Sequence, residues 1–470
     1  MRLRLTAFAA LLLAACASAS PRPPDPPGTV NDITQLNPIA VERIATPTSV
    51  DEISRLVAAH PGPISIGGGR NSQGGQTACT GCLFLDMARM NHILALDASS
   101  KIITVEAGVT WRQIQEAADA HGLSPRIMQS YSNFTVGGSI SVNCHGDYVG
   151  LGPLVSSVRS LKLILADGSI VTASRTENPD LFRAAVGGYG GIGVIAEATL
   201  DLADNTKLER IIERMPAKDY PAWFARHITG SNTAILHYAL LYPPGLEHVS
   251  TITSSLTDKP LTITDRFAPQ KRPTDFQLSL LAFVSSNPLG KFFREQVYDR
   301  MTGGNHAVAM RNYEQADDTI SLEPASRAKS TYVLQEYFVP VEAYDRFIPR
   351  MAAILKAHKV NVLNVAIRHA HADEETLLSW APRTSWAFVL YYEQGTDEAA
   401  KTKVAAWTRE LIDAAIAEGG AYYLPYQIHA TPDQFARAYP RAADFFAVKK
   451  RVDPTYKFRN RLWEAYYPAG

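Results

Sequence analysis

Two glycine-rich segments carry the clearest chemical signal in this chain. Residues 67–75 read GGGRNSQGG, and residues 131–146 read YSNFTVGGSISVNCHG. Each segment lies beside an apolar, strand-like run, so each can bring bare backbone N–H groups against a phosphate. Two such loops in one chain predict a long ligand with a pyrophosphate in its middle.

The first segment has a simpler interpretation as well. It lacks the Gly-Lys-Ser/Thr ending of a P-loop, and a glycine cluster taken alone is more often a turn than a ligand site. It does follow an apolar run at residues 64–66, its glycines can form an anion nest, and Arg70 adds a permanent charge beside them.

A third glycine cluster satisfies G-x-G-x-x-G literally, at residues 188–193. The dinucleotide fingerprint needs a strand before this motif and a helix after it, so that the pyrophosphate meets a helix N-terminus. Here a helical pattern at 180–186 precedes the motif and an alternating pattern follows it. The order is reversed, so we expect these glycines to serve close backbone packing and a Rossmann site is disfavoured.

Composition indicates a soluble globular protein of about two domains. The chain has 470 residues, 46% of them hydrophobic and 20% charged, with 46 basic and 46 acidic side chains. A net charge of zero gives no indication of nucleic acid or of an anionic membrane surface as a partner.

The N-terminus resembles an export signal. Arg2 and Arg4 precede an apolar run at 7–15, and Leu13-Ala14-Ala15-Cys16 matches the bacterial lipoprotein pattern, in which cleavage exposes a cysteine for lipidation. The alternative is an ordinary signal in which Cys16 is incidental. We expect residues 1–20 to be signal and anchor, and the proline-rich residues 21–29 to be a stiff tether. The domain would then face the periplasm or cell envelope, lipid-anchored at Cys16 and touching the membrane through that lipid only.

Three cysteines remain after the signal. In an oxidising compartment Cys79 and Cys82 could form a disulfide, and the alternative is two free thiols. Two cysteines cannot supply four zinc ligands, and no nearby histidine spacing completes a site, so we expect no metal. Cys144 lies inside the second glycine segment.

Hydrophobic patterns divide the chain near residue 205. The expected elements before that point are strands at 37–45, 64–66, 83–86, 102–109 and 194–202, helices from 50 and from 111, and a hairpin around Asp167-Gly168. The expected elements after it are strands at 332–339, 361–368 and 385–392 and helices at 341–358 and 398–418. These patterns predict an α+β protein with a nucleotide-type module at 30–205 and a second, substrate-covering domain from 206.

The glycine segments and the runs between them resemble the vanillyl-alcohol-oxidase/PCMH-type flavoproteins, nearest the decaprenylphosphoryl-ribose oxidase branch, with the aldonolactone and alditol oxidases next. The matching motifs run in family order over about 170 residues: Gly67-Gly68-Gly69-Arg70-Asn71-Ser72, Leu85-Asp86 with Asn91, Val105-Glu106-Ala107-Gly108, Thr135-Val136-Gly137-Gly138-Ser139-Ile140, Cys144-His145-Gly146, Leu165-Ala166-Asp167-Gly168 and residues 188–195. Tyr439-Pro440-Arg441 and Arg451-Val452-Asp453-Pro454 look like the family's C-terminal return.

The resemblance implies FAD as cofactor, with both glycine loops on its pyrophosphate and the flavin ring between two domains. It implies a PCMH-type FAD-binding domain at 30–205, a substrate or cap domain at 206–430, and a segment at 431–470 that returns to the flavin site. The cofactor-binding residues it implies are Ile66, Gly67, Gly68, Gly69, Arg70, Asn71, Ser72, Gln73, Ser130, Thr135, Val136, Gly137, Gly138, Ser141, Val142, His145, Gly193, Val194, Tyr423 and Asn460.

Two departures from the family bear on how FAD is held. Many relatives place a flavin-linking histidine where Arg70 stands, and bicovalent relatives place a cysteine where Asn133 stands. Neither residue present here can form those bonds, so non-covalent FAD is expected. Cys144 is expected to be an inert buried thiol.

The catalytic residues are expected to be His145, Arg368 and Tyr426. Lactone and alditol oxidases carry a Glu-x-Arg strand, and here it reads Ala366-Ile367-Arg368, so the glutamate is absent. Tyr426 stands where a lysine is usual; it could donate a hydrogen bond, or act as a base if Arg368 helps to lower its pKa well below about 10. Alternatively, Tyr423 and Tyr426 only line an aromatic cavity. Arg459 and Asn460 are expected near the flavin or the substrate.

We therefore expect an FAD-dependent oxidoreductase that oxidises a hydroxyl group of a sugar-like or other alcohol substrate by hydride transfer to flavin N5. No motif identifies its electron acceptor. The rival interpretations are a flavin-binding scaffold lipoprotein without turnover, which the absent Glu and Lys favour, and a nicotinamide-dependent dehydrogenase, which rests only on the reversed glycine motif.

Overall fold

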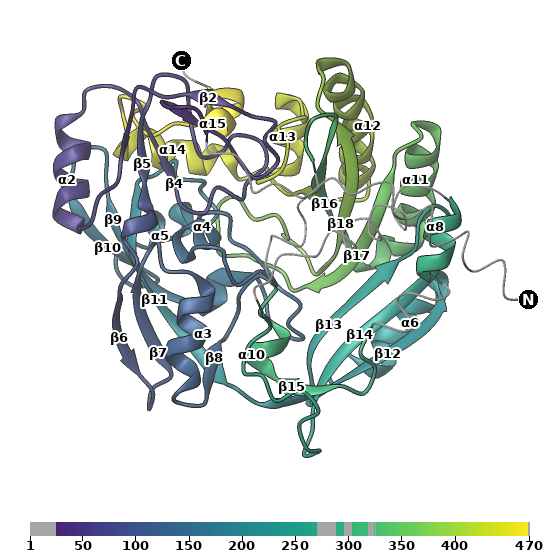
Figure 1. The fold of residues 1–470 in the computed structure, drawn as a ribbon. Coiled ribbons are helices and arrows are strands. Elements are labelled where there is room, and N and C mark those ends of the chain that lie inside the picture. The colour runs from purple at the N-terminus through teal and green to yellow at the C-terminus, as the bar shows by residue number, and fades with distance from the viewer. Residues whose placement is uncertain (1–24, 270–287, 296–302, 318–323, 325, 469–470) are drawn as a thin grey trace, which may run out of the picture.

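The computed structural model describes residues 25–269, 288–295, 303–317, 324 and 326–468, and Figure 1 shows them as two halves, each built on its own sheets. Helices and sheets mix in both halves, so the α+β prediction is confirmed. The signal sequence, Cys16 and residues 21–24 of the tether lie outside the described residues.

The first half contains two sheets. A parallel sheet has the order β3-β5-β4, and a six-stranded antiparallel sheet has the order β10-β9-β11-β7-β6, with β8 paired to β11. The strands are β3 (Arg43–Ala45), β4 (Ile64–Gly67), β5 (Leu83–Asp86), β6 (Ile93–Asp97), β7 (Ile102–Glu106), β8 (Leu123–Pro125), β9 (Val158–Ile164), β10 (Ile170–Ser174) and β11 (Val194–Asp204). The helices are α2 (Val50–Ala59), α3 (Trp111–Asp119), α4 (Val136–Ser141) and α5 (Pro179–Ala185), and a two-stranded sheet joins β1 (Thr29–Val30) to β2 (Ile39–Ala40).

Local signals set several of these boundaries. The Ser49 side chain accepts from the Glu52 N–H and begins α2, while Thr110 and Gln113 form a capping box that begins α3. The hairpin around Asp167 and Gly168 is confirmed as β9 and β10, and Gly168 takes the positive φ of 86° that this turn requires. The expected strand at 37–45 is wrong as one element, because the chain turns after β2 and begins β3 in a different sheet.

The second half is built on one eight-stranded sheet of order β15-β12-β14-β13-β17-β18-β16-β19. Its strands are β12 (Lys207–Pro216), β13 (Ala234–Leu241), β14 (His248–Leu256), β15 (Val308–Met310), β16 (Ser330–Pro340), β17 (Val362–Ala370), β18 (Ser385–Gly395) and β19 (Ala421–Tyr422). The helices are α6 (Tyr220–His227), α8 (Pro288–Phe293), α10 (Arg311–Glu314), α11 (Tyr344–Ala357) and α12 (Glu398–Ala417).

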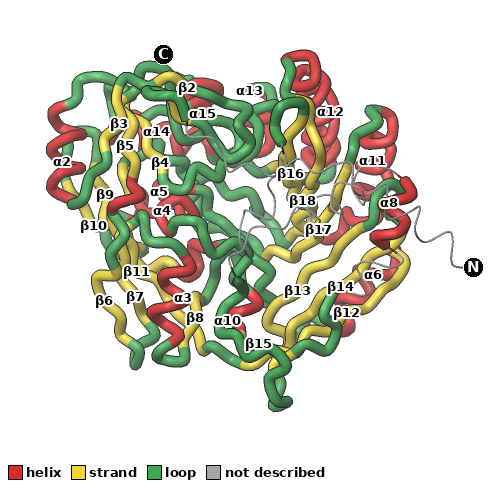
Figure 2. Tube along the Cα trace, in the orientation of Figure 1, coloured by secondary structure: helices red, strands yellow, loops and turns green. Residues whose placement is uncertain are grey.

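Helices α6, α11 and α12 cover the outer face of this sheet, and its inner face looks toward the first half (Figure 2). On the outer face the Tyr392 ring lies 4.9 Å from that of Trp407 on α12, and Phe388 lies 5.0 Å from Phe347 on α11. Side chains alternate along a strand, so neighbours such as Glu336 and Phe338 point inward instead. The sheet therefore shows one apolar face to helices and one mixed face to the space between the halves.

The chain's last helices return to the first half: α13 (Pro432–Ala438), α14 (Ala442–Val452) and α15 (Arg461–Tyr466). Phe458 forms a parallel bridge with Ile64 at the start of β4. Behind it the wholly buried Lys449 ammonium donates to Asp453 Oδ2 and to the Gly191 and Phe458 carbonyls. This segment thus braces the strand that leads into the first glycine loop.

Cys79 and Cys82 are joined in a disulfide, and Cys144 is a buried free thiol. Within the described residues, no three His, Cys, Asp or Glu side chains gather as a metal site would require. None of the helices described has both the length and the apolar character needed to cross a membrane.

Candidate active site

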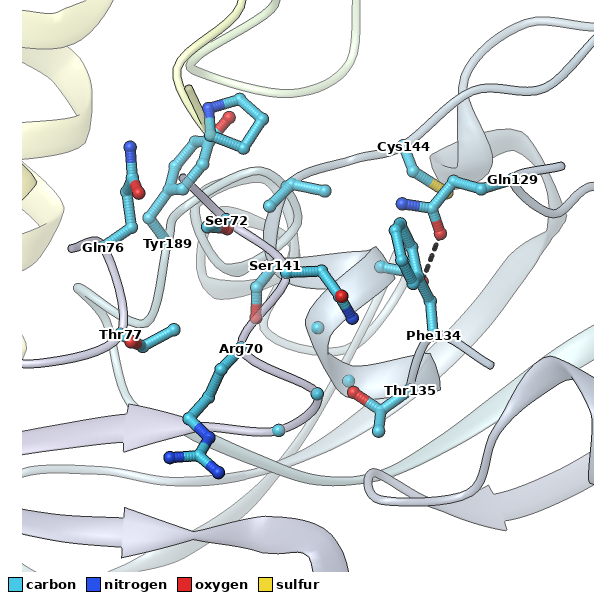
Figure 3. A pocket seen from close by; sticks show the side chains of 18 of the residues that line it. Arg70, Ser72, Gln76, Thr77, Gln129, Phe134, Thr135, Ser141, Cys144 and Tyr189 are labelled. Atoms are coloured by element: carbon cyan, nitrogen blue, oxygen red, sulfur yellow. Dashed lines mark hydrogen bonds between the residues drawn. The ribbon is translucent and has the colours of Figure 1, made fainter. Parts of the chain in front are cut away.

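A cavity of about 1390 Å³, partly open to solvent, lies between the two halves. Its walls come from the loop after β4, from α4 and the segments on either side of it, from the inner face of β16 and β17, and from residues 423–426. Figure 3 shows the part lined by the first half. Both halves contribute to these walls, so a ligand held by the glycine loops of the first half would face side chains of the second.

The loop after β4 is built to hold an anion. The backbone N–H groups of Gly69, Arg70, Asn71 and Ser72 make no hydrogen bond to any residue that the structure describes. Arg70 has a left-handed backbone with φ of 54°, and successive N–H groups around such a residue converge on one concavity. The loop therefore offers unpaired donors to a phosphate group.

The second glycine segment meets this loop at close range. A Cβ on Gly68 would lie 2.4 Å from Thr135 Oγ1, and one on Gly137 would lie 2.7 Å from the Ala107 Cβ. A Cβ on Gly138, by contrast, would approach only Thr135 Oγ1, at 2.9 Å, and would otherwise enter open space beside the cavity. The glycines thus let backbone form the cavity wall, and the residues present fit the pyrophosphate of FAD.

Arg70 lies on the wall, but its charge is already used. Its Nη1 donates to Asp25 Oδ2 at 2.8 Å, and the Asp25 side chain is 11% exposed. In Figure 3 the Arg70 side chain runs away from Ser141 and Thr135. The tether before β1 therefore contacts the cofactor loop, and backbone donors remain to bind the phosphates.

Replacing Arg70 with methionine is expected to weaken FAD binding by less than about tenfold. The guanidinium is already paired with Asp25, the backbone N–H groups that would bind the phosphates are kept, and losing a partly exposed ion pair disturbs the loop by only about 0–1 kcal/mol. The ratio of flavin to protein after dialysis against dilute FAD measures this. A complete loss of flavin would show that the guanidinium itself binds the cofactor.

Most of the predicted cofactor residues line the cavity, and three do not. Val136 and Val194 are fully buried in the core of the first half, because α4 and β11 turn those side chains inward. Asn460 caps α15 and donates to the Tyr189 carbonyl. Arg459 stacks on Tyr456, 4.4 Å from the ring centroid, and is not in the wall either. The predicted residues in the wall are Ile66, Gly67, Gly68, Gly69, Arg70, Asn71, Ser72, Gln73, Ser130, Thr135, Gly137, Gly138, Ser141, Val142, His145, Gly193 and Tyr423.

The reversed glycine motif at 188–193 follows α5 and precedes β11, so it has no helix N-terminus to offer. A Cβ on Gly188 would lie 2.1 Å from the Ala184 carbonyl, and one on Gly191 would lie 2.7 Å from Trp463 Nε1. Close packing is therefore what these glycines permit, as predicted. The loop also sets Tyr189 in the cavity wall, which the sequence did not indicate.

Arg368 projects from β17 into the cavity and is paired there. Its Nε lies 2.7 Å from Asp147 Oδ1, its Nη2 donates to Ser130 Oγ, and Ser130 Oγ donates to Asp147 Oδ2 at 3.1 Å. Burial opposes the charge, yet the carboxylates of Asp147 and Glu336 raise the pKa of Arg368 above its ordinary value. The guanidinium is thus a fixed cation with its own counter-ion.

His145 lies beside a carboxylate that the sequence did not single out. His145 Nε2 is 2.7 Å from Glu336 Oε1, and Tyr426 Oη donates to Glu336 Oε2 at 3.3 Å. Trp380, Phe338 and Tyr423 surround the imidazole, with ring centroids 4.9, 5.7 and 5.9 Å away. The three predicted catalytic residues and Glu336 therefore share one cavity.

Tyr426 does not have the lowered pKa that a tyrosine base would need. Burial first, and then the nearby charge of Glu336, raise its pKa well above the ordinary value, and Arg368 only partly opposes them. Tyr426 is a protonated hydrogen-bond donor. Burial likewise raises the pKa of the Cys144 thiol, which leaves it protonated.

Glu336 and Asp147 are the functional residues that the sequence analysis missed. One signal for Glu336 was present: it is the lone carboxylate in the apolar strand at residues 330–340, and a charge inside a buried strand requires a partner. Asp147 follows His145-Gly146 directly, but nothing local indicated that it would pair with Arg368 of β17.

Comparisons with known proteins agree with this arrangement. A family model described as "FAD binding domain" matches residues 38–174, and one described as "D-arabinono-1,4-lactone oxidase" matches residues 241–466. The chain is 24% identical to L-gulonolactone oxidase of Bos taurus over 436 residues, which cover 90% of this chain and 94% of the relative. It is 25% identical to decaprenylphosphoryl-β-D-ribose oxidase of Mycolicibacterium smegmatis over 418 residues, or 85% and 88% of the two chains.

A shorter match is to cytokinin dehydrogenase 6 of Oryza sativa, which is 33% identical over 188 residues, 38% of this chain and 36% of the relative. The phosphate cradle and the two long matches across both halves lead to one conclusion. The chain is an FAD-dependent oxidoreductase of the vanillyl-alcohol-oxidase/PCMH type, in its aldonolactone-oxidase branch.

Proposed function

We propose that this enzyme oxidises a secondary or primary hydroxyl group of a neutral, sugar-like substrate. The observation that carries the proposal is a single cavity with a backbone phosphate cradle in one half and, on the other wall, the polar side chains of Arg368, His145, Glu336 and Tyr426. Bound FAD would supply the chemistry, by accepting a hydride at N5 from the carbon that carries the hydroxyl.

We propose that FAD is held without a covalent bond. Arg70 and Asn133 occupy the two positions where family members form links, and neither side chain can do so. The donors at residues 69–72 and the close contact of Gly68 with Thr135 would hold the pyrophosphate. Acid precipitation should then release all the yellow colour into the supernatant.

The charges on the cavity wall favour a neutral substrate. The charge of Arg368 is compensated by Asp147, and Glu336 places a carboxylate on the wall itself. A phosphorylated or carboxylated substrate would meet this carboxylate beside a guanidinium whose charge is already balanced. Neutral hydroxyl groups can instead donate to Glu336 and accept from Arg368 or Tyr426.

Anaerobic flavin bleaching tests the proposed function. We expect at least one of the neutral lactones named in the relatives, L-gulonolactone, L-galactono-1,4-lactone or D-arabinono-1,4-lactone, or a linear alditol, to bleach the flavin of the purified holoenzyme. Ribose 5-phosphate and gluconate, as anionic probes, should bleach it at least tenfold more slowly. A flavin that no neutral member of the panel reduces would contradict the proposal and favour a binding role without turnover.

We also propose that the protein is exported and anchored at Cys16. Arg2, Arg4, the apolar run at 7–15 and the Leu13–Cys16 pattern support this. A Cys79–Cys82 disulfide suits an oxidising compartment.

A further inference from the structure

Glu336 is an unusual residue for its position. Its side chain is 2% exposed in the middle of β16, among Val333, Tyr337 and Phe338. A carboxylate so placed costs several kcal/mol unless it has partners, and it has two: Oε1 lies 2.7 Å from His145 Nε2, and Oε2 accepts from Tyr426 Oη at 3.3 Å. Only the contact with Tyr426 has the geometry of a hydrogen bond.

The register of the sheet places Glu336 with the site. Glu336 pairs with Val389 on β18, and Val389 pairs with Ala366 on β17, so these three side chains lie in one row across the inner face. Arg368 is on the same face, two residues beyond Ala366 along β17. Strands β16 and β17 are two strand spacings apart, about 10 Å, so Glu336 and Arg368 both lie on the wall where a substrate would bind.

We propose that Glu336 is the final acceptor of the substrate's hydroxyl proton and that Tyr426 carries the proton to it. This rests on the proposed function. As the substrate's C–H bond breaks and its hydrogen leaves with the electron pair to FAD, the O–H bond breaks and the C=O bond forms. Tyr426 Oη takes the hydroxyl proton while its own proton passes to Glu336 Oε2. One substrate proton thus becomes one carboxylic acid proton.

Burial explains why a relay is needed. Both residues line the cavity, but Glu336 is only 2% exposed, whereas Tyr426 is partly buried and its phenol donates to the carboxylate. The raised pKa of Tyr426 excludes a stored phenolate, but a phenol that gains one proton as it loses another never needs to ionise. His145 positions the carboxylate from the other side and supports its charge.

The other charged and titratable groups around Glu336 have defined effects. Arg368 on β17 favours the ionised carboxylate, while Tyr189, Tyr423 and Tyr439 are tyrosines whose pKa values are raised first by burial and further by Glu336. All three are protonated, so they add no competing charge.

The test uses Glu336→Gln in the FAD-loaded enzyme, because glutamine keeps the shape and an acceptor for Tyr426. We expect the rate of anaerobic flavin reduction by L-gulonolactone, or by the panel member that bleaches the wild type fastest, to fall about 10²–10⁴-fold. FAD content should stay at the wild-type level, and the Kd of the carbonyl product, measured from the shift it causes in the visible flavin spectrum, should change less than about threefold.

Glu393→Gln is the matched control, because Glu393 lies on the neighbouring strand β18, accepts from Ser330 and is outside the cavity wall. It should keep the wild-type rate. Tyr426→Phe provides a second variant if Glu336→Gln fails to load FAD, and it should show a comparable loss of rate. A wild-type rate in Glu336→Gln or in Tyr426→Phe would overturn the relay. Absence of bleaching in the wild type would instead contradict the proposed function, so the two failures are distinct.

Discussion

Replacing Gly138 with valine is expected to give a folded protein that no longer retains FAD. An added Cβ at this position would lie 2.9 Å from Thr135 Oγ1 and near no other atom, so only that hydroxyl would have to shift, but the side chain would project beside the cavity where the backbone must approach the pyrophosphate. We expect FAD affinity to fall at least about 100-fold, which corresponds to about 2.8 kcal/mol. The ratio of visible flavin absorbance to protein absorbance after gel filtration measures the loss.

Gly152→Val is the matched control. Gly152 also has open space around its added Cβ and lies in a loop of the same half, but it is not part of the cavity wall. It should retain FAD at the wild-type ratio. The Gly138 variant should keep the wild-type circular dichroism and melt at the temperature of FAD-free wild type, since only the ligand's contribution to stability is removed. Full flavin content in Gly138→Val would show that the cofactor does not approach α4.

Local patterns predicted much of the fold because short-range physics sets those elements. Ser49 and Thr110 satisfy the first N–H groups of α2 and α3 wherever those helices lie, and Gly168 supplies a positive φ that the β9–β10 turn needs in any context. The division into β2 and β3 was missed because it depends on which sheet each strand joins. A nine-residue apolar stretch does not specify that choice.

The cofactor half of the site was predictable and the substrate half was not, for a physical reason. Backbone phosphate cradles need glycines at fixed local spacing, and such spacing is visible in sequence. The pairing of Arg368 with Asp147, and of Glu336 with His145, arises from sheet register and from docking of the two halves, across separations of more than 190 residues. The same holds for Asp25, which neutralises Arg70 from a tether expected only to span a distance.

Replacing Asp147 with asparagine is expected to produce the largest change in stability. It would leave the Arg368 guanidinium, 19% exposed, without the carboxylate that lies 2.7 Å from it. Removing one partner of a buried ion pair costs about 3–5 kcal/mol, and the partial exposure of Arg368 places the expected fall in the free energy of unfolding near the lower value. Urea denaturation of the holoenzyme, with visible flavin release and far-UV circular dichroism as separate probes, measures it.

The same variant should alter ligand choice. With Asp147 neutral, Arg368 can accept an anion, so inorganic phosphate and ribose 5-phosphate should become competitive inhibitors of the neutral substrate, at concentrations at least tenfold lower than any that affect the wild type. Arg368→Gln alone should not gain this inhibition, and the Asp147→Asn/Arg368→Gln double variant should recover part of the lost stability, because it leaves no unpaired charge from this pair. Additive stability losses with no gain of anion binding would mean that the two side chains act independently. The selectivity for neutral substrates would then have to come from Glu336, whose carboxylate lines that wall.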